Sequence, residues 1–495
     1  MLRVLGSQKQ FCDGISRRDA LWVGGLSMLG LHLSDQLRAE QKPVRQPDNP
    51  LPGFGKAKSC ILLFLYGSPS QLELADMKPD APLEIRGDFR PIPSALPGCD
   101  VCELLPNTAK VMDRVTVLRS VTHAHPIHGV AYATTGVPKI DVPMELNPRD
   151  SRHWPFMGSV VNYLEQQRTK QDNILNNIAL PWPFSTRRTG EVHRAGPYAA
   201  FLGSKYHPHF TEFIGKANKQ ITKTLTTTTK TFDEPYVGIE PDCQFTLGQA
   251  ATLPVDMTLD RLDQRTSLLQ QMERAQAKAS PTNRDHFRQG AFDLIRSTHV
   301  RDALDISREK SALRDQYGMT VFGQAALAAR KLVEAGSRFV TVFWDEFGLA
   351  GSGWDTHWEH YPRMKDELMP GFDKAFSGLI ADLDQRGMLD ETLVLVLSEH
   401  GRTPKINKAK GGGRDHWSQA YSVMMAGGGI KRGQVIGKTD NIGGTVVDRP
   451  ISPKDILATT YHLLGYDLET VLHDQASGRP YPILSEGSVL TDAIA

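Results

Sequence analysis

The sequence predicts an α/β protein with a mostly parallel central sheet and helices on both of its faces. Continuous apolar runs of five to seven residues recur along the chain, and such runs are typical of strands buried on both faces. Ala- and Leu-rich segments with helical spacing lie between the later runs. Because strands that alternate with helices favour βαβ units, this order predicts parallel strands with helices packed against both faces.

Five segments carry the strand pattern. The first is the run Cys-Ile-Leu-Leu-Phe-Leu-Tyr, which ends directly before Gly67. The predicted strands cover residues 60–66, 115–119, 338–344, 392–397 and 420–426.

The predicted helices are longer than the strands. Residues 323–335 are rich in Ala and Leu and end before a glycine, which suits the left-handed residue that often follows a helix. Residues 361–386 repeat apolar side chains at helical spacing and also end before a glycine. Residues 258–279 and 285–307 are predicted as two amphipathic helices.

The chain is predicted to contain an export signal, a linker and one large domain. Residues 1–39 contain the pair Arg17-Arg18 and then a short apolar run, which is the pattern of a twin-arginine signal for export to the periplasm or the exterior. Residues 40–57 are polar and Pro-rich and are assigned as a linker. Residues 58–495 form a single α/β domain, in which residues from about 140 to 255 are expected to be an insertion of irregular or β structure.

Composition excludes several classes of protein. The 495 residues carry a formal net charge of +1, and this balance argues against a nucleic-acid partner. No uninterrupted apolar stretch reaches the length of a membrane span, so no stable span is expected once the signal is removed. Five cysteines are too few for a disulfide framework, and the lone Cys99-x-x-Cys102 is interpreted as structural or incidental thiols.

Histidines and carboxylates gather in the segments that follow two predicted strands. In doubly wound sheets, ligands bind beyond the carboxyl ends of the strands. Imidazole and carboxylate groups are the ligands that Zn, Ca, Mg or Mn ions take, and two such ions can clamp both oxygens of a phosphoryl or sulfuryl transfer. The candidate ligands are Asp355, His357, Glu359 or His360, Glu399, His400, Asp415 and His416.

Two arginines and one acid complete the predicted site. Arg402 and Arg414 flank the clusters and are candidates to hold an oxyanion bidentately, with surface salt bridges as the alternative. After the first strand, Glu73 or Asp76 is a further candidate ligand, with a solvated loop acid as the alternative.

The nucleophile is less well defined. Ser70, Thr122 and His128 are the candidates near strand ends. None of them lies in a G-x-S-x-G elbow, which disfavours a Ser-His-Asp hydrolase.

Residues 387–401, with the sequence GMLDETLVLVLSEHG, resemble the last sheet segment of sulfatases and the alkaline-phosphatase superfamily. Residues from about 57 to 480 resemble DUF1501, an exported bacterial family of unknown function that is abundant in planctomycetes. The shared motifs are KPDAP at 78–82, YG at 317–318 before ARKL at 329–332, DTH at 355–357, SEHGRTP at 398–404, GRDHW at 413–417 and AGGG at 426–429.

The superfamily resemblance implies two metal sites. One takes Asp355, His357 or a neighbour, and His416; the other takes Glu399, His400, an acid after the first strand and the nucleophile.

This sequence departs from the superfamily pattern in three places. Glu399 stands where the superfamily usually has Asp, and no acid directly follows the first strand, so Glu73 is the nearest substitute. Residues 126–129 occupy the approach to the expected nucleophile, which leaves His128 as a ligand, a base or the nucleophile.

We therefore expect an exported, metal-dependent hydrolase of phosphate or sulfate esters. Its substrate would be a small-molecule or glycan ester. The alternative is an exported protein of the same fold that binds a glycan or a protein without catalysis.

Overall fold

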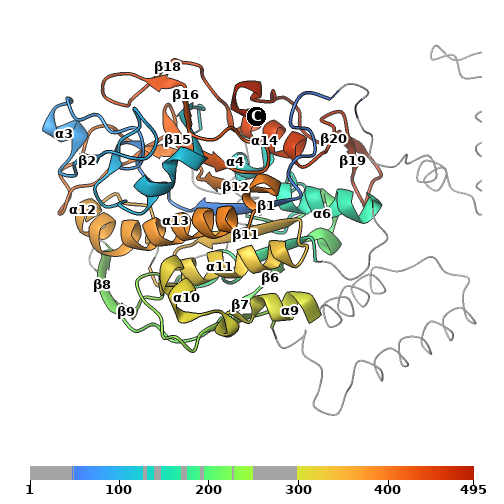
Figure 1. The fold of residues 1–495 in the computed structure, drawn as a ribbon, viewed down its shortest axis with the longest axis horizontal. Helices are drawn as coiled ribbons and strands as arrows, with labels where there is room; N and C mark the ends of the chain where they lie inside the picture. The colour runs from blue at the N-terminus through green and yellow to red at the C-terminus, as the bar shows by residue number, and fades with distance from the viewer. Residues whose placement is uncertain are drawn as a thin grey trace, which may run out of the picture.

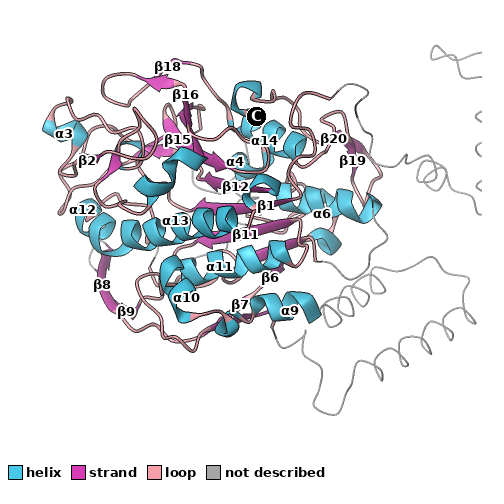
Figure 2. Cartoon of the chain, in the orientation of Figure 1, coloured by secondary structure: helices cyan, strands magenta, loops and turns pink. Residues whose placement is uncertain are grey.

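The structure, a computed structural model, describes residues 47, 50–125, 131–138, 147–168, 175–189, 194, 196–225, 228–248, 298–349 and 351–495. Its centre is an eight-stranded sheet with the order β16-β4-β15-β12-β1-β11-β5-β6 (Figures 1 and 2). Among these described strands only β15 runs against the others, which confirms the predicted mostly parallel sheet. The strands are β1 (Ser59–Leu65), β4 (Val115–Val121), β5 (Asn177–Leu180), β6 (His209–Phe210), β11 (Phe339–Trp344), β12 (Thr392–Leu397), β15 (Tyr421–Ala426) and β16 (Gln434–Ile436).

Strand β1 lies in the middle of the sheet, between β11 and β12. Leu62 is in register with Thr341 of β11 and Leu395 of β12. Its neighbours Ile61 and Leu63 belong to one hydrophobic core, whereas Leu62 itself belongs to the other. Because successive side chains of a strand point to opposite faces, a strand covered on both faces needs an unbroken apolar run.

Helices cover both faces, as the sequence predicts. Helices α11 (Val321–Glu334) and α13 (Met369–Gln385) lie side by side across one face (Figure 1). Helices α6 (Met157–Arg168) and α14 (Pro453–Leu463) pack into the core of the other face. Thr320 is the N-cap residue directly before α11, and its side chain accepts a hydrogen bond from the Gly323 amide.

The predicted helix over residues 361–386 is continuous but not uniform. It begins with α12 (His360–Arg363), passes through a π-helical turn (Met364–Leu368) and continues as α13.

The remaining elements are short. Among the described residues the other helices are α3 (Leu83–Arg86), α4 (Ala131–Thr135), α9 (Thr298–Leu304) and α10 (Ser311–Tyr317), together with 3₁₀ turns at 71–73, 108–114, 200–202, 204–206, 306–308, 389–391 and 491–493. In the part of the chain that the structure describes, six strand pairs lie outside the central sheet. They are β2 (Pro91–Ile92) with β3 (Val101–Cys102), β7 (Glu212–Ile214) with β10 (Gln244–Thr246), β8 (Gln220–Leu225) with β9 (Thr228–Asp233), β13 (Gly401–Arg402) with β14 (His416–Trp417), β17 (Lys438–Thr439) with β18 (Val446–Asp448), and β19 (Val471–His473) with β20 (Pro480–Pro482).

The insertion expected at about 140–255 differs from the structure in its first half. There α6 packs into the core, and β5 and β6 belong to the central sheet, where β5 pairs in parallel with β11. The physical reason is that β5 spans only four residues and α6 is buried over most of its surface, so neither has the length or periodicity that identifies an element in sequence. The second half, with β7 to β10, does consist of short β pairs.

Several other predictions lie outside the described residues. These are the export signal, most of the linker, the amphipathic helix over 258–279 and most of the one over 285–307, of which α9 is the described end. Cys99 and Cys102 are described, and both are buried free thiols. In the described part of the chain, no helix combines the length and apolar character needed to cross a bilayer.

Candidate metal centre

The predicted site lies where the carboxyl ends of β1, β11 and β12 meet. These three strands are parallel neighbours, so the loops that follow them leave the same edge of the sheet. The loop after β1 continues into a short 3₁₀ helix, the loop after β11 carries residues 345–359, and the loop after β12 leads through β13 to β14. Strands β13 and β14 pair Arg402 with His416, which brings the last predicted ligand back to this edge.

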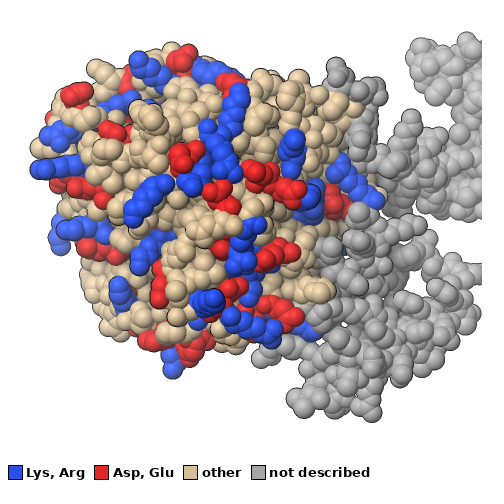
Figure 3. All heavy atoms as spheres, viewed as in Figure 1, with Lys and Arg blue, Asp and Glu red and all other residues tan. Residues whose placement is uncertain are grey.

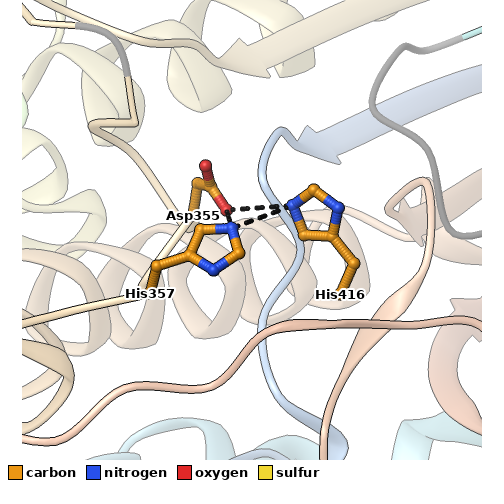
Figure 4. A group of neighbouring side chains, drawn as sticks. All are labelled: Asp355, His357 and His416. Atoms are coloured by element: carbon orange, nitrogen blue, oxygen red, sulfur yellow. Dashed lines mark hydrogen bonds and ion pairs between the residues drawn. The ribbon is translucent and has the colours of Figure 1, made fainter. Parts of the chain in front are cut away.

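Asp355, His357 and His416 point toward a common centre (Figure 4). The Asp355 Oδ1 atom lies 3.0 Å from His357 Nε2 and 3.4 Å from His416 Nε2, and the two imidazole nitrogens are 3.0 Å apart. Donor atoms around a tetrahedral zinc ion with bonds of about 2.0–2.1 Å lie about 3.3 Å apart. Two imidazoles and one carboxylate at these separations therefore fit a divalent metal ion with at least one further position open.

Asp415 supports this arrangement from outside it. Its Oδ1 atom lies 2.6 Å from His357 Nδ1, on the opposite side of the ring from the triad. Metal-bound histidines usually donate their second ring N–H to a carboxylate, which fixes the tautomer and the ring orientation. Asp415, one of the candidate ligands from the sequence, is thus placed to orient His357.

The electrostatics of the triad favour a cation. The hydrogen bond to Asp355, followed by that to Asp415, raises the pKa of His357 despite its partial burial. A metal ion would take the place of the proton between the same atoms, so binding would release a proton. The His357 side chain is 30% exposed and that of His416 24% exposed, so the centre is open to solvent on one side.

Arg402 holds Asp355 against the turn that follows β1. Its Nη2 atom donates to Asp355 Oδ1 at 2.5 Å and also to the carbonyl of Gly67. Gly67 has a φ of +91°, and a Cβ atom there would collide with the Asp355 backbone nitrogen. The close approach of these two loops therefore requires glycine at this position.

Arg402 and Arg414 are both fully buried. Arg402 donates its remaining hydrogen bonds to the carbonyls of Ser68 and Arg414, and Arg414 donates to carbonyls of residues 85, 403 and 404. Both guanidinium groups bind protein oxygens here, and because both are buried the alternative of surface salt bridges does not apply to them. Their predicted catalytic role stays a prediction.

Glu73 lies in a separate buried cluster. Its Oε1 atom accepts from Arg414 Nε and Nη2 at 3.0 and 2.5 Å and lies 3.5 Å from His360 Nε2. Burial alone would raise the pKa of Glu73, but Arg414 and His360 outweigh it and lower the pKa to about 2. Glu73 is therefore ionised, and the structure places it with Arg414 rather than with the triad.

Glu399 and His400 border the triad without joining the three-atom group among the described residues. Glu399 Oε1 accepts from the Gly67 amide at 2.9 Å. The His400 Nδ1 atom lies 2.8 Å from the Gly401 carbonyl, and its ring centre is 4.5 Å from that of His416. Glu399 thus contacts the turn after β1, and the His400 ring packs beside that of His416.

Of the histidines after β4, His123 reaches the site and His128 lies outside the described residues. His123 Nε2 lies 2.9 Å from the Glu399 carbonyl, and burial lowers its pKa to about 4, so the ring is neutral. Among the nucleophile candidates, the Ser70 hydroxyl accepts from the Leu72 amide and caps the 3₁₀ helix.

Sequence reasoning missed Asp345, the first residue after β11. Its side chain accepts from the Ser185 amide at 2.7 Å and the Glu346 amide at 2.8 Å. Burial raises the pKa of Asp345 to about 7, although the hydrogen bond from Ser185 opposes this. The available signal was an acid directly after a largely apolar strand.

Comparison with known structures gives distant likenesses. A sulfatase from Pseudoalteromonas sp. is 14% identical, with a TM-score of 0.36 over 97% of this chain and 77% of that one. The lipoteichoic acid synthase LtaP from Listeria monocytogenes is 10% identical, with a TM-score of 0.38 over 91% and 80%. A phosphonate monoester hydrolase from Silicibacter pomeroyi is 10% identical, with a TM-score of 0.32 over 85% and 75%. At these TM-scores the likenesses do not establish a shared activity.

Curated proteins give no match to this sequence. A family model, in contrast, matches residues 57–494. That range includes the central sheet and all three residues of the triad. The chain therefore belongs to DUF1501, a family described as a protein of unknown function.

Proposed function

We propose that this protein is a metal-dependent hydrolase of phosphate or sulfate esters. The observation that carries the proposal is the triad of Asp355, His357 and His416, whose three donor atoms lie within 4.8 Å of one another at the carboxyl edge of the sheet. A pre-oriented imidazole and an open side are properties of catalytic rather than closed structural metal sites. The resemblance to the alkaline-phosphatase superfamily supports the reaction class.

A divalent metal at this centre would polarise the ester and lower the pKa of a bound water. The chain's own residues supply the frame for that chemistry. Asp415 holds the His357 ring so that Nε2 faces the centre. Arg402 fixes the Asp355 carboxylate and keeps positive charge close to the place where an anionic ester would lie.

Attraction of an anionic substrate must be local. On the described part of the face seen in Figure 3, Lys and Arg side chains are interspersed with Asp and Glu. A surface of mixed sign exerts little long-range steering. The bound metal and the buried guanidinium of Arg402 are therefore the groups expected to favour a small-molecule or glycan ester.

Metal content tests the site assignment. The purified protein is stripped with a chelator and titrated with Zn²⁺, Mn²⁺, Mg²⁺ or Ca²⁺, alongside Asp355→Asn and His416→Gln. We expect both variants to lose affinity for the preferred metal, because each removes one of three ligands. His299→Gln, on the exposed surface of α9, is the matched control. Equal metal affinity in all four proteins would disprove the assignment.

Activity is then tested with aryl phosphate and aryl sulfate esters. The loaded protein should hydrolyse at least one ester class, and Asp355→Asn should lose that activity while remaining folded. If the protein binds metal but hydrolyses no ester, the binding alternative replaces the proposed enzyme.

We also propose export by the twin-arginine route. The support is the Arg17-Arg18 pair followed by an apolar run over residues 21–33. Replacing both arginines with lysine should keep the protein in the cytoplasm of a host that has this pathway. Undiminished export of that variant would contradict the proposal.

A further inference from the structure

Four buried residues connect the two chain segments that carry the candidate ligands. Thr356 lies between the two ligands of its own loop, and its hydroxyl is 2.8 Å from His360 Nδ1. His360 Nε2 faces Glu73 Oε1 at 3.5 Å, and the same oxygen accepts from Arg414. The Arg414 backbone amide donates to the Thr356 carbonyl at 3.0 Å, which closes the circuit.

We propose that Thr356, His360, Glu73 and Arg414 form a positioning ring that sets the distance between the Asp355–His357 pair and His416. The inference rests on the proposed function, because it assumes that these three residues hold a metal. It assigns Glu73 the role of a positioning residue instead of a ligand.

The hydrogen-bond directions in the ring are consistent. Burial lowers the pKa of His360, so its imidazole is neutral. The Thr356 hydroxyl then donates to Nδ1, and Nε2, which carries the N–H, faces the Glu73 carboxylate at 3.5 Å without a hydrogen bond to it. Arg414 completes the ring with two donors to the same oxygen of Glu73.

Stability alone does not account for such a ring. All four side chains have exposed fractions of 1% or less. Burying an ion pair of the Arg414–Glu73 kind costs desolvation that its attraction roughly offsets, and apolar replacements are often equally stable. A buried polar ring beside a metal triad is therefore best explained by the geometry that it imposes on the ligands.

The ring lies next to the residues whose spacing determines whether one metal ion can bind. Arg414 lies two residues before His416, and Thr356 lies directly before His357. The two imidazole nitrogens are 3.0 Å apart, close to the spacing that one ion requires. The Arg414 side chain is also fixed by the carbonyls of residues 85, 403 and 404, so the ring ties both ligand segments to rigid backbone.

The test compares Thr356→Val, which removes the hydroxyl at constant shape, with Thr356→Ser, which keeps it. Co²⁺ is titrated into the chelator-stripped protein, and affinity and visible absorption are recorded. We expect Thr356→Val and Glu73→Gln to weaken Co²⁺ binding about 10–100-fold and to alter the absorption bands, as loss of supporting contacts does elsewhere. Thr356→Ser should stay near wild type, as should Thr460→Val, a buried threonine in α14.

A second measurement does not need metal. Hydrogen exchange of the stripped protein should show that Thr356→Val speeds exchange in both residues 355–361 and residues 414–417. A rise confined to the first segment, or unchanged Co²⁺ affinity in both Thr356→Val and Glu73→Gln, would overturn the ring. If wild type binds no Co²⁺ or other divalent metal, the proposed function fails, and the exchange result still decides whether the ring couples the two segments.

Discussion

Asp345→Asn should change the pH dependence of stability. The pKa of Asp345 is raised by burial from 3.8 to about 7, so the folded protein holds a proton that the unfolded chain releases. For a group whose pKa is higher in the folded state, the stability contribution is complete below the unfolded pKa. It is lost as pH rises through the folded pKa. Asp345 thus destabilises the folded protein increasingly as pH rises toward 7.

The magnitude follows from the two pKa values. At pH 5 the pKa of the folded side chain lies about two units above the pH, so its protonation stabilises the folded protein. At pH 8 the pKa lies below the pH, and this stabilisation is gone. At 1.36 kcal/mol per unit, the contribution falls by about 3 kcal/mol between pH 5 and pH 8. Asn cannot ionise, so Asp345→Asn should lack this part of the slope.

The assay is urea unfolding of metal-free wild type and Asp345→Asn at several pH values from 5 to 8. Asp345→Asn lowers the free energy of unfolding by an amount that does not depend on pH. The reason is that the amide NH₂ of Asn cannot accept one of the two backbone hydrogen bonds that the carboxylate accepts. Only the difference in slope is diagnostic, and histidines that titrate in both proteins cancel from it. Asp366→Asn, an exposed residue, is the control. Parallel stability curves for wild type and Asp345→Asn would refute the reasoning.

Three further changes have defined outcomes. Gly67→Ala should cost about 1–3 kcal/mol of unfolding free energy and weaken metal binding, because the left-handed backbone and the Asp355 amide leave no room for Cβ. Arg402→Met should destabilise the metal-free protein by about 3–5 kcal/mol, and added metal should restore part of this by neutralising Asp355, as thermal unfolding with and without metal will show. Leu63→Ala, at a fully buried position of β1, should cost about 2–5 kcal/mol in urea unfolding without changing metal affinity per folded molecule.

Local patterns in the sequence were enough to predict the fold class and the residue types of the candidate metal ligands. Strands such as 392–397 are buried on both faces and must be continuously apolar, and a helix that ends at a left-handed residue favours the glycine seen at 336. The short strand β5 escaped prediction because four residues hold too little pattern, and its place is set by pairing with β11.

The sequence also predicted a candidate metal site, because histidines and carboxylates follow two strands and ligands bind beyond the carboxyl ends of such strands. It could not show which of them meet. Glu73 and Arg414, which are hydrogen-bonded, lie 341 residues apart in the sequence, and Arg402 and Asp355 lie 47 residues apart. Contacts over such separations depend on how loops pack at the sheet edge, and no local pattern records that packing.

By itself, then, the sequence determined an α/β protein and predicted a set of candidate metal ligands at one edge of its sheet, because burial and ligand chemistry are properties of local residue types. Only the tertiary structure selected Asp355, His357 and His416 from that set and placed Glu73 and both arginines in buried contacts beside them. The physical reason is that coordination requires atoms within a few ångströms, and that proximity arises from the packing of two chain segments that are distant in sequence.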